Sequence, residues 1–194
     1  FELYLTGRVA DVVVFDQCRF QGADLSGTVL ERVRFTHCHI DRSNFANVRA
    51  EKSALQCARF TASRLTGLHW PDGTLRDVVI SGCRADLAAF RFTTFRRVVF
   101  EDCNLAGADF SHADLSGTRF LDCDLTGAQF SQATMTGAYF RGCTLTGVGG
   151  ITSFAGARIT GHDLIALSYT LASALGIEIG DDEADDQATD QSRR

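Results

Sequence analysis

An unbroken five-residue period runs through most of this chain. Every fifth position from Phe20 to Leu145 is apolar, and all twenty-six positions of the series obey the rule. Since 45% of the residues are hydrophobic, independent choice would produce such a run with a probability on the order of 10⁻⁹. The residue two positions before each apolar centre is mostly small, as at Cys18, Ala23 and Ala108. The pentad is therefore the structural unit of the chain.

A period of five predicts a coil and not a flat sheet. On an extended chain a centre and the residue two before it point the same way, whereas the next centre would point to the opposite face. The chain must therefore turn once in every pentad to keep all the centres inside. Cys103, Cys123 and Cys143 are twenty residues apart, which indicates four pentads in each coil. At a strand spacing of about 4.8 Å the coils would stack into a rod segment roughly 30 Å long.

Several pentads resemble the A(D/N)LXX repeat of the pentapeptide-repeat family. The clearest are residues 23–27 (ADLSG), 113–117 (ADLSG) and 123–127 (CDLTG). This resemblance covers about residues 3–159 and implies an all-β fold, a right-handed quadrilateral β-helix (a pentapeptide-repeat solenoid) with a C-terminal α-helical cap. In that fold the centre and the small residue before it fill the interior, and each coil pairs with the next.

The chain divides into three expected segments: the solenoid over residues 1–159, a capping segment over 160–180 and a disordered acidic tail over 181–194. The pentad spacing breaks at residues 147–150, and Phe154 and Ile159 restart it one residue early. Residues 160–163 are typical of a helix start, Gly176 is a helix stop, and residues 177–179 are expected to form a short strand. The apolar residues of this segment should cap the last coil and form a homodimer interface: Leu164, Leu167, Tyr169, Leu171, Leu175 and Ile177.

One stretch of the repeat is irregular. The pattern thins between Ser63 and Val98, where Trp70 occupies a centre that elsewhere is Phe or Leu and Pro71 follows it. Proline lacks the N–H that a ladder hydrogen bond needs. We expect either a local bend or bulge at this point, or an irregularity that the coil tolerates.

The residue patterns contain no catalytic, cofactor-binding or metal-binding motif. In the sequence 37–39 (HCH), Cys38 faces inward and the two histidines face outward, so the three side chains do not converge on a metal. The other cysteines in the small-residue position should be free core thiols, and Cys57 alone falls outside it. Residues 147–150 lack the spacing and the lysine of a phosphate-binding loop. We expect a protein that is not an enzyme and needs no cofactor.

The charge is uneven along the chain. Residues 1–100 carry ten acidic and fourteen basic residues, residues 101–180 carry eight and three, and residues 181–194 carry six and two. Size, register and C-terminal helix resemble the Qnr/MfpA-like quinolone-resistance branch of the family. That resemblance implies a DNA mimic whose acidic rod binds a type II topoisomerase (DNA gyrase or topoisomerase IV), as a homodimer joined through the C-terminal segment. The acidic residues expected to face the partner are Glu101, Asp102, Asp109, Asp114, Asp122, Asp124 and Asp163.

A structural or scaffolding solenoid with another protein partner is the alternative, because the repeat itself specifies a fold and not a function. The Trp70-Pro71 region, with Arg91, Arg96 and Arg97, would then be its contact site. Neither alternative involves direct nucleic-acid or membrane binding. The start of the sequence lacks the pattern of a signal peptide, and the cysteines suit a reducing compartment, so a cytoplasmic protein is expected.

Overall fold

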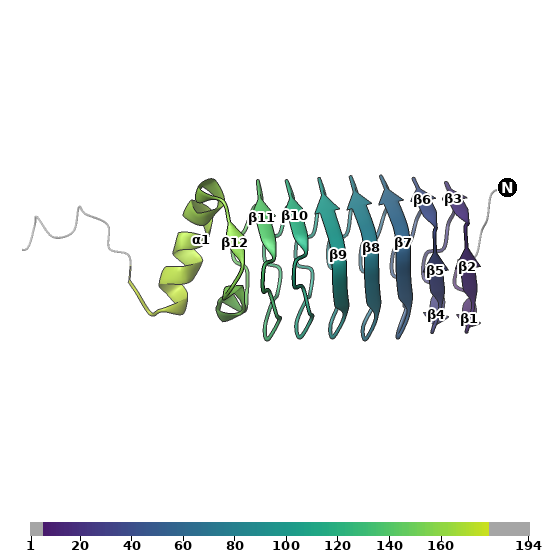
Figure 1. The fold of residues 1–194 in the computed structure, drawn as a ribbon, viewed down its shortest axis with the longest axis horizontal. Helices are drawn as coiled ribbons and strands as arrows, with labels where there is room; N and C mark the ends of the chain where they lie inside the picture. Colours follow the sequence, from purple (N-terminus) through teal and green to yellow (C-terminus); the bar gives the residue numbers. More distant parts are fainter. Residues whose placement is uncertain (1–5, 179–194) are drawn as a thin grey trace, which may run out of the picture.

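The computed structural model describes residues 6–178, which form a rod of stacked coils with a helix at one end (Figure 1). Residues 1–5 and 179–194 lie outside the described residues, and with them the expected acidic tail and Ile179. The strands and helices are β1 (Val9–Asp11), β2 (Val14–Asp16), β3 (Arg19–Gln21), β4 (Val29–Glu31), β5 (Arg34–Thr36), β6 (His39–Asp41), β7 (Ala54–Thr61), β8 (Thr74–Ser81), β9 (Thr94–Glu101), β10 (Arg119–Leu121), β11 (Tyr139–Arg141), η1 (Ile151–Phe154), β12 (Arg158–Ile159) and α1 (Gly161–Ala174).

Each coil contains twenty residues, as the cysteine spacing predicts. Parallel strand pairing joins Leu55 to Leu75 and Phe100 to Phe120, and isolated bridges such as Asp24 to Asn44 keep the same offset on the other sides. The coils form a parallel, right-handed quadrilateral β-helix of about eight turns. The predicted fold class is therefore confirmed.

The turn in each pentad is made by one residue with a left-handed backbone. Positive φ angles recur at every fifth position from Gly7 to Gly147, two residues after each apolar centre. Glycine occupies many of these corners, but residues with side chains, such as Asp102 and Asp122, occupy others at φ 50° and 53°. These corners rotate the chain so that each following centre again points inward, which a straight strand of odd period cannot do.

The interior is a column of stacked apolar side chains. The rings of Phe100, Phe120 and Phe140 stack with centroid separations of 5.2 and 4.9 Å, and Phe110 stacks on Phe130 at 5.3 Å. All five rings are fully buried. Burial of one such side chain contributes about 1.5–3 kcal/mol, so the repeat supplies the same stabilising contact again in each coil.

Of the two alternatives at Trp70-Pro71, the strand register contradicts a bulge and agrees with an irregularity that the coil tolerates. His69 pairs with Arg49 before it and Ala89 after it at the regular offset of twenty residues. Trp70 is buried, and its indole Nε1 donates a hydrogen bond to the Ser53 carbonyl oxygen at 3.1 Å. Proline is tolerated because this side of the coil does not need the amide for the ladder: at the equivalent position two coils later, Ser111 donates locally to the Asp109 carboxylate.

The last coil is shortened by one residue, as predicted. Phe140 pairs with Ile159, an offset of nineteen, and η1 occupies the side of the coil before that pairing. Helix α1 then lies against the open end (Figure 1). The helix ends at Ala174, and Gly176 forms the expected stop, because Gly176 donates to the Ser173 carbonyl and Ile177 to the Ala172 carbonyl. The strand expected at residues 177–179 is wrong for its described part, since Ile177 and Glu178 lie in no strand.

All seven cysteines are free, and Cys57 is the exposed one, as predicted. Burial raises the pKa of the Cys38 thiol and of the Cys143 thiol, so both stay protonated at neutral pH. No helix among residues 6–178 has the length and apolar character required to cross a bilayer.

Candidate partner-binding surface

Three of the predicted acidic residues help to shape the corners of the solenoid. Asp109, Asp114 and Asp124 stand immediately before an apolar centre and are half-buried. Their Oδ1 atoms accept backbone hydrogen bonds from Ser111, Ser116 and Thr126 at 2.9–3.0 Å. Each carboxylate therefore satisfies an amide at the turn, which explains why Asp recurs at this position of the repeat.

Three of the acidic residues also pair with arginines. Asp114 lies 2.8 Å from Arg96 and Asp109 lies 3.7 Å from Arg91, and Arg141 lies 3.4 Å from Asp122. Burial opposes ionisation of Asp114, but hydrogen bonds from Arg96 and Ser116 outweigh it and hold the pKa of Asp114 below its ordinary value. These pairs reduce the negative potential that Asp109 and Asp114 present to a partner.

Four of the predicted acidic residues gather at one corner of the rod, here called the acidic corner: Glu101, Asp102, Asp122 and Asp124. Asp102, Asp122 and Asp124 line one depression of about 580 Å³, whose other walls include Gly82, Arg84 and Asn104. Glu101, Asp102 and Asp122 are exposed, and of the four residues only Asp122 has an ion pair within the described part of the chain. The acidic corner is thus the part of the predicted surface that remains available to a cationic partner.

Asp163 does not belong to this surface, which corrects the prediction. Its side chain is 1% exposed. Its two carboxylate oxygens accept hydrogen bonds from the backbone amides of Gly142 and Cys143 at 3.0 and 3.1 Å, and from the Thr160 hydroxyl at 2.6 Å. In regular coils the next coil supplies these acceptors, as when Gly22 donates to the Asp41 carbonyl oxygen and Ala23 donates to the Ser43 hydroxyl oxygen. Asp163 is therefore a cap of the solenoid.

Only the middle of the predicted apolar set on α1 packs against the solenoid. Leu167 is buried and Leu171 is half-buried against the core. By contrast, Leu164 is half exposed, Tyr169 and Leu175 are 67% and 75% exposed, and Ile177 is also exposed. Leu167 and Leu171 therefore cap the solenoid, and the other four residues of the set are uncovered within the described chain.

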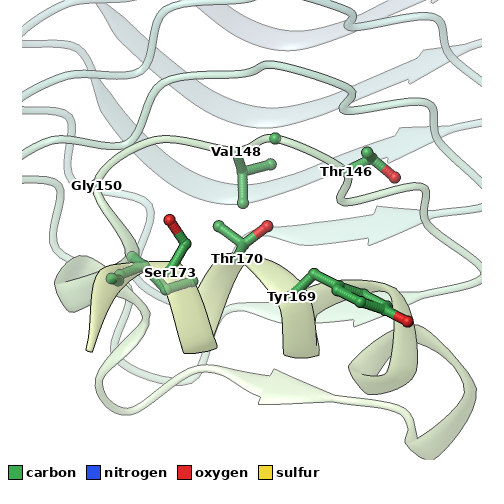
Figure 2. A pocket seen from close by; sticks show the side chains of 9 residues that line it. Thr146, Val148, Gly150, Tyr169, Thr170 and Ser173 are labelled. Atoms are coloured by element: carbon green, nitrogen blue, oxygen red, sulfur yellow. The ribbon is translucent and has the colours of Figure 1, made fainter. Parts of the chain in front are cut away.

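A groove separates α1 from the last regular coil. Its volume is about 730 Å³, and Figure 2 shows Val148 and Thr170 pointing into it from opposite sides, with Ser173 beside them and Tyr169 nearer its end. This groove and the exposed side chains of Leu164, Tyr169, Leu175 and Ile177 together form the helical end surface.

The predicted contact site of the alternative function is only partly exposed. Trp70 is buried and cannot touch a partner. Arg91, Arg96 and Arg97 are exposed. Sequence reasoning missed a neighbouring surface pair, Leu87 and Phe92, which are large, exposed and set at corners with φ 58°. The signal was present, because most other corners of the repeat carry Gly or polar residues at the same position.

The described residues contain no group of three or more His, Cys, Asp or Glu side chains arranged to hold a metal ion. In the sequence 37–39, Cys38 is buried while His37 and His39 are exposed, as the period predicts. His37 instead lies 3.4 Å from the Asp16 carboxylate.

Comparison with known proteins identifies the repeat. A sequence model described as "Pentapeptide repeat region" matches residues 13–90 and 86–149. Among solved structures, a trypsin-treated variant of QnrB1, a plasmid-mediated fluoroquinolone resistance protein, is 22% identical with a TM-score of 0.38, over 93% of this chain and 100% of its own. HetL from Nostoc sp. strain PCC 7120, involved in heterocyst differentiation regulation, is 14% identical with a TM-score of 0.28, over 73% and 89%. A search of curated proteins returns no match.

Proposed function

Because the chain belongs to the pentapeptide-repeat family, we propose that it is a DNA-mimicking, non-enzymatic protein that binds a type II topoisomerase, DNA gyrase in the first instance. Binding would modulate the enzyme or protect it from poisons that trap its cleaved complex. The free cysteines suit a reducing compartment such as the cytoplasm.

The observation that carries the proposal is the acidic corner. Asp102 and Asp122 occupy the same corner of successive coils, so their carboxylates repeat along the rod axis at about the strand spacing of 4.8 Å. DNA presents one phosphate charge per about 3.4 Å along each strand. Lysine and arginine side chains that bind phosphates also accept carboxylates at a comparable spacing.

A homodimer through the helical end surface would extend this acidic surface. Leu164, Tyr169, Leu175 and Ile177 are exposed there, and a symmetric contact would cover the same residues on both copies. The acidic halves of two rods would then adjoin at the centre of the dimer, and the basic halves would point away from it.

A supercoiling assay tests the proposal. Purified protein is titrated into gyrase with relaxed plasmid, with and without a cleavage-stabilising poison, and the expected result is loss of supercoiling or rescue from cleavage near stoichiometric protein. The variant Asp102→Lys/Asp122→Lys/Asp124→Asn should weaken this effect at least tenfold. Lysine is acceptable at these corners because Lys52 already occupies one with φ 51°, and asparagine at 124 keeps an oxygen for the Thr126 amide.

The matched control is Glu31→Lys/Glu51→Lys, which makes the same type of charge change at exposed positions in the basic half. It should retain the effect of the wild-type protein. If gyrase and topoisomerase IV both ignore a tenfold excess of folded protein, or if the control loses as much activity as the acidic-corner variant, the DNA-mimic proposal is wrong.

A scaffolding role is the second candidate, and the pair Leu87 and Phe92 favours it. The Phe92 ring stacks on His112 at 4.5 Å and lies 6.0 Å from the Arg91 guanidinium, so it is held in place on the surface. A large apolar residue at a left-handed corner is unfavourable in two ways, because its side chain is exposed to water and its backbone is strained. If Leu87 and Phe92 contact a scaffolding partner, the variant Leu87→Gly/Phe92→Asn should no longer bind that partner. The same variant should keep any effect of the wild-type protein on gyrase.

A further inference from the structure

Four cysteines form a column inside the solenoid, here called the thiol column. Cys83, Cys103, Cys123 and Cys143 occupy the same buried position in four successive coils. Each thiol donates a hydrogen bond to the carbonyl oxygen two residues before it, at 3.2–3.5 Å. Because all four side chains make the same contact, they share one orientation, and their sulfur atoms repeat at the coil spacing of about 4.8 Å.

Hydrogen bonds within the thiol column favour ionisation of one of its inner thiols. The Ser63 backbone amide donates to Cys83 Sγ at 3.4 Å, so the sulfur atoms also accept hydrogen bonds from the preceding coil. Hydrogen bonds from Cys123 and Cys83 to the Cys103 thiolate lower the pKa of Cys103 and outweigh the burial that opposes its ionisation. The thiolate is the form of cysteine that binds metal ions.

Two of the four cysteines border the surface at the acidic corner. Cys83 and Cys103 line the depression of about 580 Å³ there. Arg84 lies in the same depression, but its guanidinium is paired with Asp86 at 2.9 Å. Three carboxylates of the acidic corner also line it, and they attract cations to the place where the thiol column is nearest to solvent: Asp102, Asp122 and Asp124.

The spacing of the sulfur atoms determines what the thiol column can bind. A disulfide requires Cβ atoms about 3.5–4.5 Å apart, which is less than the coil spacing. A metal–sulfur bond is about 2.3 Å long, so a linear sulfur–metal–sulfur unit spans about 4.6 Å and fits between successive coils. A tetrahedral ion such as Zn²⁺ needs four converging ligands, which thiols in a straight column cannot supply.

We propose that the thiol column binds a soft monovalent metal ion of the copper(I) class, held in line between the thiolates of Cys83 and Cys103. Thiolate ligands select copper(I) over harder ions. The two thiol protons leave to solvent, the oxidation states of metal and sulfur do not change, and the product is a bis(thiolate) complex with one net negative charge. Such an ion needs only two ligands, so the site requires no cluster of three metal-binding residues, and the described residues contain none.

The test compares variants with the same number of thiols in different positions. All carry Cys18→Ala, Cys38→Ala and Cys57→Ser, which removes the cysteines outside the thiol column. Cys123→Ser/Cys143→Ser keeps two thiols in adjacent coils, whereas Cys103→Ser/Cys143→Ser keeps two thiols that are two coils apart. Serine suits this column, because the Ser43 and Ser63 hydroxyls precede the cysteines in it and donate to the carbonyl oxygen two residues before them at 2.9 and 2.8 Å.

Copper(I) is added to the full-length variants as its bicinchoninate complex without oxygen. Loss of the colour of the complex measures affinity, and native mass spectrometry counts the bound ions. The variant with adjacent thiols should bind one ion at least tenfold more tightly than the variant with separated thiols. Urea unfolding without metal shows whether each variant is folded, and Cys83→Ser/Cys123→Ser is a second variant with separated thiols that should bind as weakly.

Three results would overturn the proposal. Equal affinity of the variants with adjacent and separated thiols would mean that copper(I) binds single sulfur atoms or an unfolded chain. Absence of binding to the folded variant with adjacent thiols would mean that the ion does not enter the column. Displacement of copper(I) by an equal concentration of Zn²⁺ would mean that the site is not linear.

Discussion

Trp70 fits inside the solenoid because Gly73 has no side chain. Trp70 is the largest side chain of the core, and a Cβ on Gly73 would stand 2.3 Å from its ring and 2.9 Å from the Ser53 carbonyl oxygen. Two later coils carry the smaller pairs Phe110 with Ala113 and Phe130 with Ala133 at the equivalent positions. The five-residue period predicts that position 70 is buried, but it does not reveal this exchange of volume between two sides of one coil.

The exchange predicts a compensating pair of substitutions. Gly73→Ala alone should lower the free energy of unfolding by about 1–3 kcal/mol through overpacking, and Trp70→Phe alone by a similar amount through a cavity and the loss of the bond to Ser53. The double variant recreates the pair found at Phe110 and Ala113, so its cost should be clearly smaller than the sum. Urea unfolding of all four proteins measures the coupling, and strictly additive costs would contradict the argument.

Helix α1 completes the solenoid through one carboxylate and two leucines. Its start, its stop and the shortened last coil follow from Thr160, Gly176 and the position of Ile159 in the sequence. The role of Asp163 does not, because its pattern is that of an ordinary acidic residue in a first helical turn. Only the structure shows that the Asp163 carboxylate replaces the acceptors that a further coil would offer to the amides of Gly142 and Cys143.

The cap predicts a graded effect of substitutions at Asp163. Asp163→Ala leaves two backbone donors without their acceptor and should cost about 1–3 kcal/mol for each donor that becomes unsatisfied. Asp163→Asn retains one carbonyl oxygen and should cost less. Urea unfolding of both variants is compared with Asp16→Ala, an exposed aspartate that should change stability little. Equal losses in the alanine and asparagine variants would mean that the hydrogen bonds do not account for the effect.

At the scale of the whole molecule, the rod has a basic half and an acidic half. The composition predicts this polarity, and the period predicts which side chains face outward. Neither predicts that Asp109 and Asp114 are paired with arginines of the preceding coil, nor that Glu101, Asp102, Asp122 and Asp124 gather at one corner. Those properties depend on contacts between successive coils, about twenty residues apart, and therefore appear only when the coils are stacked.

The helical end surface predicts the oligomeric state. The wild-type chain should be a dimer in solution, because Tyr169 and Leu175 are largely exposed in a single chain and a symmetric contact would cover them. Tyr169→Asp/Leu175→Asp would place charges in a symmetric apolar contact and should produce a monomer. Both side chains lie outside the core, so the midpoint of urea unfolding measured at low protein concentration should change little.

Light scattering coupled to gel filtration measures the mass of both proteins, and Leu87→Asp, another exposed apolar residue far from α1 in the sequence, serves as the control. The control should remain a dimer. A wild-type monomer, or a double variant that stays dimeric, would show that α1 is a cap alone. If the monomeric variant still acts on gyrase at the wild-type concentration, the acidic corner works from a single rod and the joined acidic halves are not required.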